Sequence, residues 1–283
     1  MTYRNYARCM RYILSKLGIV FAPLVAIVGV YSLSLSDTIL DETICNVFNI
    51  NSHVQEGLLR VVAILFTFLL IVLLGFLRKF NIRKDHKVVD GLFSMYPIIA
   101  LGLSVFVFCN ILNIAVGNTI RPMQIVRLTF HMLMVGAFEE LLFRGVVQNI
   151  LMCQLRRNNW IIAIFIQSLI FGICHLTNNT DPIQKFEQCF FSMMAGFFFG
   201  LAYYKTKSLV AGIFVHGLYD LSLNFYNCYL PIGSDFKSID GLNWYSVTLA
   251  AILCVFLFIL RRKYYNSKQT NTLKEVELEL GIV

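Results

Sequence analysis

The chain has 283 residues, of which 58% are hydrophobic and 14% are charged, and its mean hydropathy is +0.69. An ordinary soluble domain carries about 25% charged residues, so the composition argues against that class and predicts a protein of the lipid bilayer. The formal net charge is +8, but the basic residues lie in short clusters between apolar runs. This pattern is typical of cytoplasmic loops rather than of a nucleic-acid-binding surface.

Apolar runs that are long enough to cross a hydrocarbon core of about 30 Å recur along the whole chain. In chain order, membrane spans are predicted at 17–35, 58–77, 91–113, 124–152, 159–177, 189–204, 208–226 and 244–260. The sequence therefore predicts an all-α fold, a polytopic membrane helix bundle of about eight transmembrane helices.

The connections between these spans alternate in charge. Basic residues precede the first span and follow the second, fourth, sixth and eighth spans, whereas acidic residues follow the first, fifth and seventh. The basic members after the second span are Arg78, Lys79, Arg83, Lys84 and Lys87, and the later ones are Arg156, Arg157, Lys205, Lys207, Arg261, Arg262 and Lys263. Because basic residues gather on the cytoplasmic side, we expect a multi-pass protein of the cell membrane with both termini in the cytoplasm.

No cleavable signal peptide is expected, because the apolar run after the basic N-terminus continues to about Leu35, too far for a signal-peptide core. The eight cysteines are scattered without a CxxC pair, which indicates small buried apolar residues rather than a disulfide framework. Residues 1–283 are expected to form a single transmembrane domain that ends in a polar cytoplasmic tail at 264–283.

The fourth predicted span contains "VGAFEELLFRG" and so places three charged residues inside an apolar helix. Each such charge costs at least about 2.5 kcal/mol on insertion, so it indicates a function or a partner. Glu140 and Arg144 are four residues apart and share a helix face, which predicts an ion pair. Glu139 lies about 100° around the helix from Glu140. We therefore interpret Glu140 and Arg144 as support and Glu139 as the working group.

Two other spans supply groups that Glu139 could face. The fifth span ends in "FGICH" with His175, and the seventh contains "HGLYD", which places His216 and Asp220 on one face. Polar groups on apolar helices converge on the bundle interior, since lipid offers them no hydrogen-bond partner. A carboxylate and a histidine can activate a water, and a second histidine can stabilise the oxyanion that forms at a carbonyl.

These three stretches resemble, in order and spacing, the motifs EExxxR, FxxxH and HxxxN/D. Those motifs define the CAAX-protease and bacteriocin-processing family of intramembrane endopeptidases, also called the Abi family, which includes proteins similar to CAAX prenyl protease 2. The matching stretches are "EELLFR", "FGICH" and "HGLYD". The resemblance covers roughly residues 124–226, which would form the catalytic core.

The resemblance implies an eight-helix core whose active site lies within the membrane and opens to the cytoplasm. It implies that Glu139 and His175 activate the water, and that His216 and Asp220 stabilise the oxyanion. Glu140 and Arg144 would hold the helices in register, with Phe171 of the second motif as a further supporting residue. The substrate would be a peptide or protein at the cytoplasmic face.

The family is called a metalloprotease family, so a metal has to be considered. Glu139, His175 and His216 could ligate zinc and leave one position open for water. The chain has no HExxH motif, the strongest sequence signal for a zinc protease. A metal-free glutamate mechanism is the interpretation that we favour.

Prenyl-protein proteases typically carry Asn in the third motif, where this chain has Asp220. An ionised Asp220 cannot donate to an oxyanion, although it could orient His216 and keep it protonated, or itself stay protonated in a low-dielectric site. This departure favours the bacterial branch of the family over prenylated substrates, and the composition fits a bacterial source.

The predicted depths of the site residues differ. Glu139 lies 17 residues before Arg156, whereas His216 lies only nine residues after Lys207, a difference of about two helical turns. Either the fourth and fifth helices extend beyond the bilayer, or the site lies behind a cytoplasmic vestibule.

Two other functions use the same residue types. Intramembrane carboxylates and histidines also serve as proton relays in transporters, but the chain lacks the repeats and the paired broken helices of that class. A non-catalytic immunity or binding protein on the same scaffold would keep its full biological activity when Glu139 is replaced by alanine.

Overall fold

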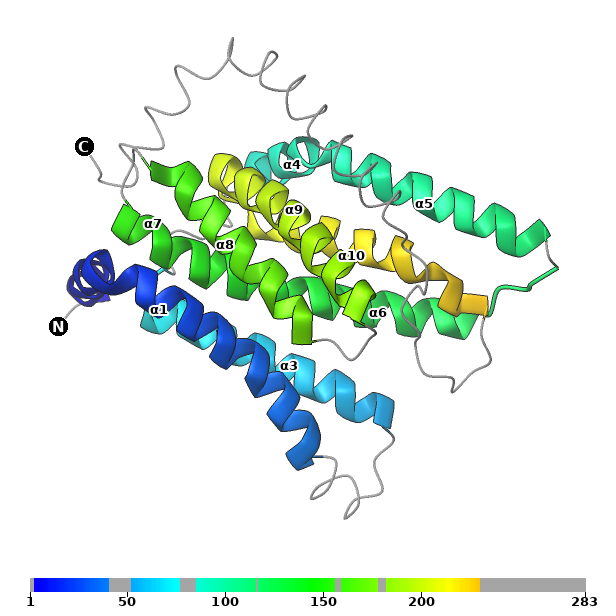
Figure 1. Ribbon diagram of the computed structural model, residues 1–283, viewed down its shortest axis with the longest axis horizontal. Helices are drawn as coiled ribbons and strands as arrows, with labels where there is room; N and C mark the ends of the chain where they lie inside the picture. The colour runs from blue at the N-terminus through cyan, green and yellow to red at the C-terminus, as the bar shows by residue number, and fades with distance from the viewer. Residues whose placement is uncertain are drawn as a thin grey trace, which may run out of the picture. The chain divides into compact units, whose positions relative to one another are not determined.

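The computed structural model describes residues 3–40, 52–76, 85–115, 117–155, 159–177 and 182–229, all within the first compact unit of the chain, Met1–Gly241. Every regular element in these residues is helical (Figure 1), which confirms the all-α prediction. The elements are α1 (Tyr3–Leu40), α3 (Ser52–Leu73), α4 (Asp85–Ser94), α5 (Tyr96–Ala115), α6 (Pro122–Glu139), η3 (Glu140–Gln148), α7 (Asn149–Leu155), α8 (Trp160–Cys174), η5 (His175–Thr177), α9 (Pro182–Thr206), α10 (Leu209–Asn224) and η6 (Phe225–Tyr229).

The first seven predicted spans each fall on described helices, while the eighth, at 244–260, and the tail at 264–283 lie outside the described residues. By length and composition, two described helices could cross a membrane, Asn5–Tyr31 within α1 and Tyr96–Ala115, which is α5. The apolar helices Gly57–Leu73 and Trp160–Cys174 are shorter. The number of membrane crossings therefore stays a prediction.

The third predicted span, 91–113, is not one continuous helix. The chain forms α4 up to Ser94, turns at Met95 and starts α5 at Tyr96. Pro97 lies in the first turn of α5, where its missing N–H costs nothing because that group has no intrahelical partner. Inside a continuous helix the same residue would remove a hydrogen bond and clash with the preceding turn, so the helix restarts here.

The motif-bearing helices cross at very small separations. A Cβ at Gly136 of α6 would lie 2.7 Å from the backbone nitrogen of Gly217 in α10, so only glycine allows this approach. Small residues at helix crossings are typical of membrane bundles, where close packing drives association. The crossing brings the end of α6, with Glu139, against the middle of α10, with His216.

The fourth predicted span, 124–152, is a continuous helical stretch, but its middle is a π-helix. The helix η3 begins at Glu140 and ends at Gln148, between α6 and α7. Its side chains are almost all buried, including Glu140, Arg144 and Gln148. π-helical turns are rare and occur frequently at functional sites, and this one starts between the two adjacent glutamates.

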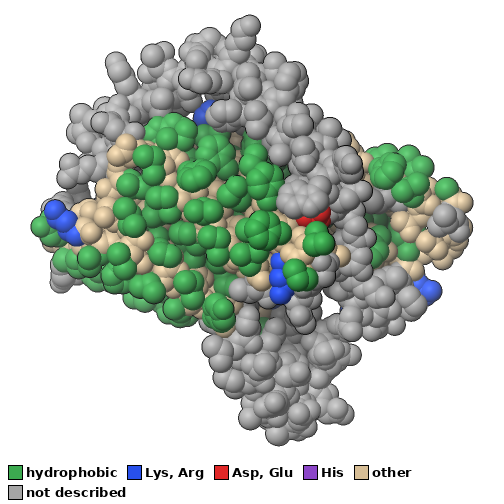
Figure 2. All heavy atoms as spheres, viewed as in Figure 1, with side chains coloured by type: hydrophobic (Ala, Val, Ile, Leu, Met, Phe, Trp, Pro, Cys, Tyr) green, Lys and Arg blue, Asp and Glu red, His purple; other side chains and the backbone are tan. Residues whose placement is uncertain are grey.

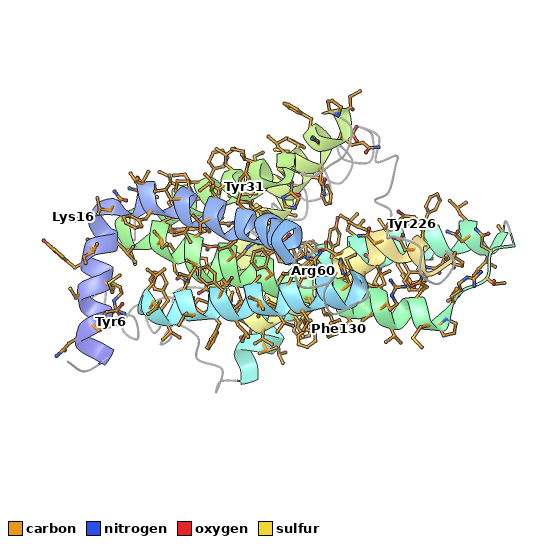
Figure 3. The ribbon with its side chains drawn as sticks, turned by 90° about the horizontal axis from the view of Figure 1, so that it is seen from below. Tyr6, Lys16, Tyr31, Arg60, Phe130 and Tyr226 are labelled. Atoms are coloured by element: carbon orange, nitrogen blue, oxygen red, sulfur yellow. The ribbon has the colours of Figure 1, made fainter. Side chains whose placement is uncertain are left out.

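Helix α1 is bent. Figure 3 shows its first part turning sharply near Lys16 before the helix continues through Tyr31. At the bend, the side-chain oxygen of Gln154 accepts a hydrogen bond from the backbone N–H of Ile19, and its amide nitrogen donates to the Lys16 carbonyl at 3.3 Å. A side chain from α7 therefore satisfies backbone groups on both sides of the bend.

Candidate active site

Glu140 and Arg144 form the predicted ion pair. Arg144 Nη1 lies 2.9 Å from Glu140 Oε1, and both side chains are buried, with 0% and 1% exposure. The same carboxylate oxygen also accepts from His216 Nδ1 at 2.9 Å. Glu140 thus joins Arg144 on its own helical segment to His216 on α10. Glu140 is therefore placed to hold the imidazole as well as the helix register, as a supporting residue would be.

Glu139 and Asp220 approach the other nitrogen of the same imidazole. His216 Nε2 lies 3.3 Å from Glu139 Oε2 and 3.6 Å from Asp220 Oδ2. The predicted face shared by His216 and Asp220 therefore exists, and α10 presents both residues to Glu139. In contrast to Glu140, Glu139 and Asp220 keep 19% and 20% of their side chains exposed. They are the carboxylates that a water or substrate can reach.

The protonation of this cluster follows from its geometry. A neutral imidazole has one N–H donor and one lone-pair nitrogen, yet both ring nitrogens of His216 face carboxylate oxygens. The arrangement therefore favours a protonated, positively charged His216. A neutral His216 would instead require that one of the facing carboxylates carries a proton. The three carboxylates of the cluster carry three negative charges when all are ionised. Arg144 and an imidazolium at His216 carry two positive charges, so one negative charge is in excess. Asp220 is partly exposed, so a water can supply the balancing proton to its carboxylate.

Two phenylalanine rings enclose the charged centre. The guanidinium carbon of Arg144 lies 4.8 Å from the Phe171 ring centre and 5.3 Å from that of Phe199. Phe199 also stacks on the His216 ring at 4.8 Å and 19°. A third fixed contact is the hydrogen bond from Arg144 Nη2 to the Gly196 carbonyl at 3.2 Å. Aromatic faces attract cations, so these rings stabilise the buried guanidinium while they exclude water from it.

His175 reaches the site through Phe171. Its Nδ1 lies 2.8 Å from the Phe171 carbonyl oxygen, and the two rings are in edge contact at 4.7 Å. A carbonyl can only accept, so Nδ1 carries a proton, and Nε2 is left as the nitrogen that can accept from a water. Among the described residues, Glu139 contacts His216, and no hydrogen bond or ion pair joins Glu139 to His175.

Residues 121–222 match the family model described as Type II CAAX prenyl endopeptidase Rce1-like. This part of the chain is an Rce1-like domain. The matched residues contain all three motifs, and they cover somewhat more than a third of the chain. The family is membrane-associated, and its general activity is that of a CAAX protease-type endopeptidase. No curated protein and no solved structure matches the chain.

The Rce1-like domain does not present an arranged metal site within the described residues. No group of three His, Cys, Asp or Glu side chains in the described residues is placed to hold a metal ion. The proposed zinc ligand His216 has Nδ1 directed at Glu140 and Nε2 at Glu139 and Asp220, so it is already engaged at both nitrogens. This donor set does not fit a bound zinc.

The structure adds two residues to the Rce1-like site that the sequence did not reveal. Phe199 is one of 25 phenylalanines in the chain and lies outside the three motifs. Gly212 lies one turn before His216, and a Cβ there would meet Glu140 Oε2 at 2.8 Å. The i−4 spacing from His216 was the available signal for Gly212; no sequence signal distinguishes Phe199.

Gly212→Ala is expected to lower the cleavage rate of the Rce1-like domain by at least about ten-fold. The added methyl would lie 2.8 Å from Glu140 Oε2, so the carboxylate has to move and its hydrogen bond to His216 is disturbed. Gly57→Ala is the matched control, since a Cβ at Gly57 meets nothing within 4 Å. Both variants would be assayed for peptide cleavage in detergent. Equal rates for Gly212→Ala and the parent would show that Glu140 does not need this position.

Proposed function

We propose that the protein is an intramembrane endopeptidase that hydrolyses a peptide bond with a water activated by Glu139 and His175. The observation that carries the proposal is the difference between the two adjacent glutamates. Glu140 is enclosed with Arg144, whereas Glu139 touches the same imidazole from a position that remains partly exposed. A general base has to reach a water that also reaches the substrate, and of the two adjacent glutamates Glu139 meets that requirement.

In the proposed reaction, Glu139 takes a proton from the water while the water oxygen attacks the carbonyl carbon of the substrate. Nε2 of His175 accepts a hydrogen bond from the second O–H of the water and so orients the water. Nε2 is the nitrogen that can do this because Nδ1 donates to the Phe171 carbonyl. The carbon–nitrogen bond then breaks, and Glu139 returns its proton to the leaving amine. The products are an amine and a carboxylic acid, which loses its proton to the surrounding water to become a carboxylate, and Glu139 is again ionised.

His216 and Asp220 are proposed to stabilise the oxyanion. Once Glu139 binds the water proton, it no longer competes as a negative acceptor for the His216 Nε2 proton, which becomes available to the substrate oxygen. Asp220, at 3.6 Å from Nε2, can donate a second hydrogen bond in its protonated form. Donors that are fixed before the charge develops stabilise it at little reorganisation cost.

Asp220→Asn is expected to keep cleavage within about ten-fold of the parent, because an amide donates to an oxyanion without needing a proton. Asp220→Leu is expected to lose about 10²–10³-fold, the usual effect of removing one oxyanion donor. Single-turnover cleavage rates of the two variants check this. If Asp220→Asn loses as much as Asp220→Leu, Asp220 acts as a charged partner of His216 instead of a donor.

The membrane setting is proposed from the surface of the described helices. Large apolar side chains are more than half exposed on several elements, among them Leu24 on α1, Leu65 on α3, Phe108 on α5 and Phe130 on α6. The face drawn in Figure 2 is predominantly hydrophobic, with few charged side chains in its described part. A water-soluble protein seldom exposes so much apolar area. We propose a multi-pass bundle of about eight helices with cytoplasmic termini.

The substrate class is tested by comparing peptides released from membranes that contain the parent chain or the His175→Ala variant. We expect fragments of a membrane-bound peptide or protein to appear with the parent and to be absent with the variant. Identical fragments with inserted, folded His175→Ala would contradict the proposed mechanism. Proton-coupled uptake by proteoliposomes without any cleavage would favour a transporter.

A further inference from the structure

Helix α1 is too long to be a single membrane span. Its 38 residues would extend about 57 Å at 1.5 Å per residue, against a hydrocarbon core of about 30 Å. The predicted first span begins at residue 17, and the observed bend lies near Lys16 (Figure 3). The bend therefore separates a spanning part from an N-terminal segment, Tyr3–Lys16, that runs crosswise to it.

The crosswise course of the N-terminal segment is fixed by contacts. The Tyr6 hydroxyl donates to the carbonyl of Leu73, the last residue of α3, at 2.6 Å. Ala7 packs on Gly75, where a Cβ would lie only 2.7 Å from the Ala7 Cα and where φ is +77°, so both the close packing and the backbone conformation require glycine. Leu14 is buried in the main core cluster. Together with Gln154 at the bend, these anchors hold the segment across the end of α3.

The segment is strongly basic. It contains four basic residues and no acidic residue, and the first acidic residue of the chain is Asp37. The basic residues are Arg4, Arg8, Arg11 and Lys16. At 100° per residue, positions 4, 8 and 11 fall within about 60° of one another and form one stripe along the helix. Tyr12 and Ile13 are 68% and 40% exposed, and position 13 lies about 170° from the centre of the stripe.

The ends of the elements beside this segment are basic too. Leu73 of α3 is followed along the chain by Arg78 and Lys79, and Leu155 of α7 by Arg156 and Arg157. Gln154 of α7 and Leu73 of α3 both contact the segment. The segment therefore lies at the end of the bundle that the charge pattern predicts to be cytoplasmic, where the leaflet is anionic.

We propose that Tyr3–Lys16 is an interfacial helix that binds the anionic phospholipid headgroups of the cytoplasmic leaflet. The basic stripe faces the phosphates and Ile13, on the opposite side, enters the acyl boundary, with Tyr12 at an angle between them, the arrangement of amphipathic helices that lie in the interface plane. The contacts with α3 and α7 hold the helix in place before it meets lipid. The proposal rests on the membrane placement proposed above, and it is independent of the catalytic residues.

Native mass spectrometry of the full chain, released from nanodiscs of equimolar phosphatidylglycerol and phosphatidylcholine, tests this proposal. We expect the parent to retain phosphatidylglycerol preferentially. Each basic residue near a membrane surface contributes a factor of about five, so Arg8→Gln/Arg11→Gln is expected to lower the preference about 25-fold. Arg121→Gln/Lys185→Gln removes the same charge elsewhere and is expected to leave it unchanged. Arg8→Lys/Arg11→Lys is expected to retain it.

The proposal is overturned if the parent retains both lipids equally, or if the glutamine pair at 8 and 11 keeps the parent preference. An equal loss with Arg121→Gln/Lys185→Gln would also overturn it, since net charge alone would then explain the effect. Displacement of bound lipid by soluble glycerol phosphate would indicate a phosphate pocket instead. If the double glutamine variant does not fold, Arg4→Gln alone is expected to lower the preference about five-fold. Lipid retention does not depend on cleavage, so this outcome is separate from the fate of the proposed function.

Discussion

Glu139→Gln is expected to reduce kcat/KM for peptide cleavage by about 10²–10⁴-fold, the usual contribution of a positioned general base. Glutamine keeps the size of the side chain and can still accept a hydrogen bond from His216 Nε2, 3.3 Å away in the parent. It cannot take a proton from water. Because substrate binding does not need that proton transfer, KM is expected to change little, and the loss should appear in kcat.

The measurement is cleavage of a membrane peptide by purified parent and variant, with insertion and thermal unfolding checked in parallel. Asp90→Asn makes the same carboxylate-to-amide change at an exposed position of α4, and it is expected to cleave at the parent rate. A folded Glu139→Gln protein that cleaves at the parent rate would remove the catalyst proposed here. Retention of full biological activity without cleavage by either protein would instead indicate a binding or immunity role.

Arg144→Met is expected to lower the free energy of unfolding by about 3–5 kcal/mol, because it removes the guanidinium that pairs with the buried Glu140 carboxylate. Methionine is of similar length and apolar, so the space between Phe171 and Phe199 stays filled. The measured loss of unfolding free energy therefore reports the broken ion pair and not a cavity. Reversible unfolding in mixed detergent micelles gives the free energy.

A double-mutant cycle separates the coupling energy of the Glu140–Arg144 pair from the destabilisation that each single substitution causes by itself. In Glu140→Gln/Arg144→Met both members are neutral, so the double variant is expected to be more stable than the sum of the two single losses by about 0.5–3 kcal/mol. Arg121→Met is the control, because Arg121 is exposed in front of α6, and it is expected to change stability by less than about 0.5 kcal/mol. Strict additivity in the cycle would show that the ion pair contributes nothing beyond its separate side chains.

The parts of the site that lie within one helix were predictable from the sequence. Glu140 with Arg144, and His216 with Asp220, are each four residues apart, and each pair is in contact in the structure. Helical periodicity fixes such contacts whatever surrounds the helix. The positions of the helices were also predictable, because each long apolar run is a local feature of the sequence. The break before Tyr96 was also a local signal, because Pro97 is visible in the sequence, but the continuous apolar run from 91 to 113 masked it.

Contacts between helices were predictable only in outline. The motif order indicated that Glu139 and His216 converge, and the 3.3 Å contact agrees. The two-turn difference in their predicted depths does not keep them apart, because Gly145 lies beside Leu209 at the start of α10 and the helical stretch continues beyond it to Leu155. Three contacts between helices were not predicted. They are the hydrogen bond between Glu140 and His216, the stacking of Phe199 on His216, and the close approach of Gly212 to Glu140.

The sequence by itself determined the all-helical class, the positions of the first seven apolar helical stretches, the intrahelical ion pairs and the Rce1-like motifs. Only the tertiary structure decided which glutamate is enclosed and which stays reachable, since Glu139 and Glu140 are chemically identical neighbours. It also decided that α1 turns at Lys16, because Gln154 comes from a helix more than a hundred residues away. The physical reason is the same in both cases. Local periodicity is set by the backbone, whereas burial and partner choice depend on how separate helices pack.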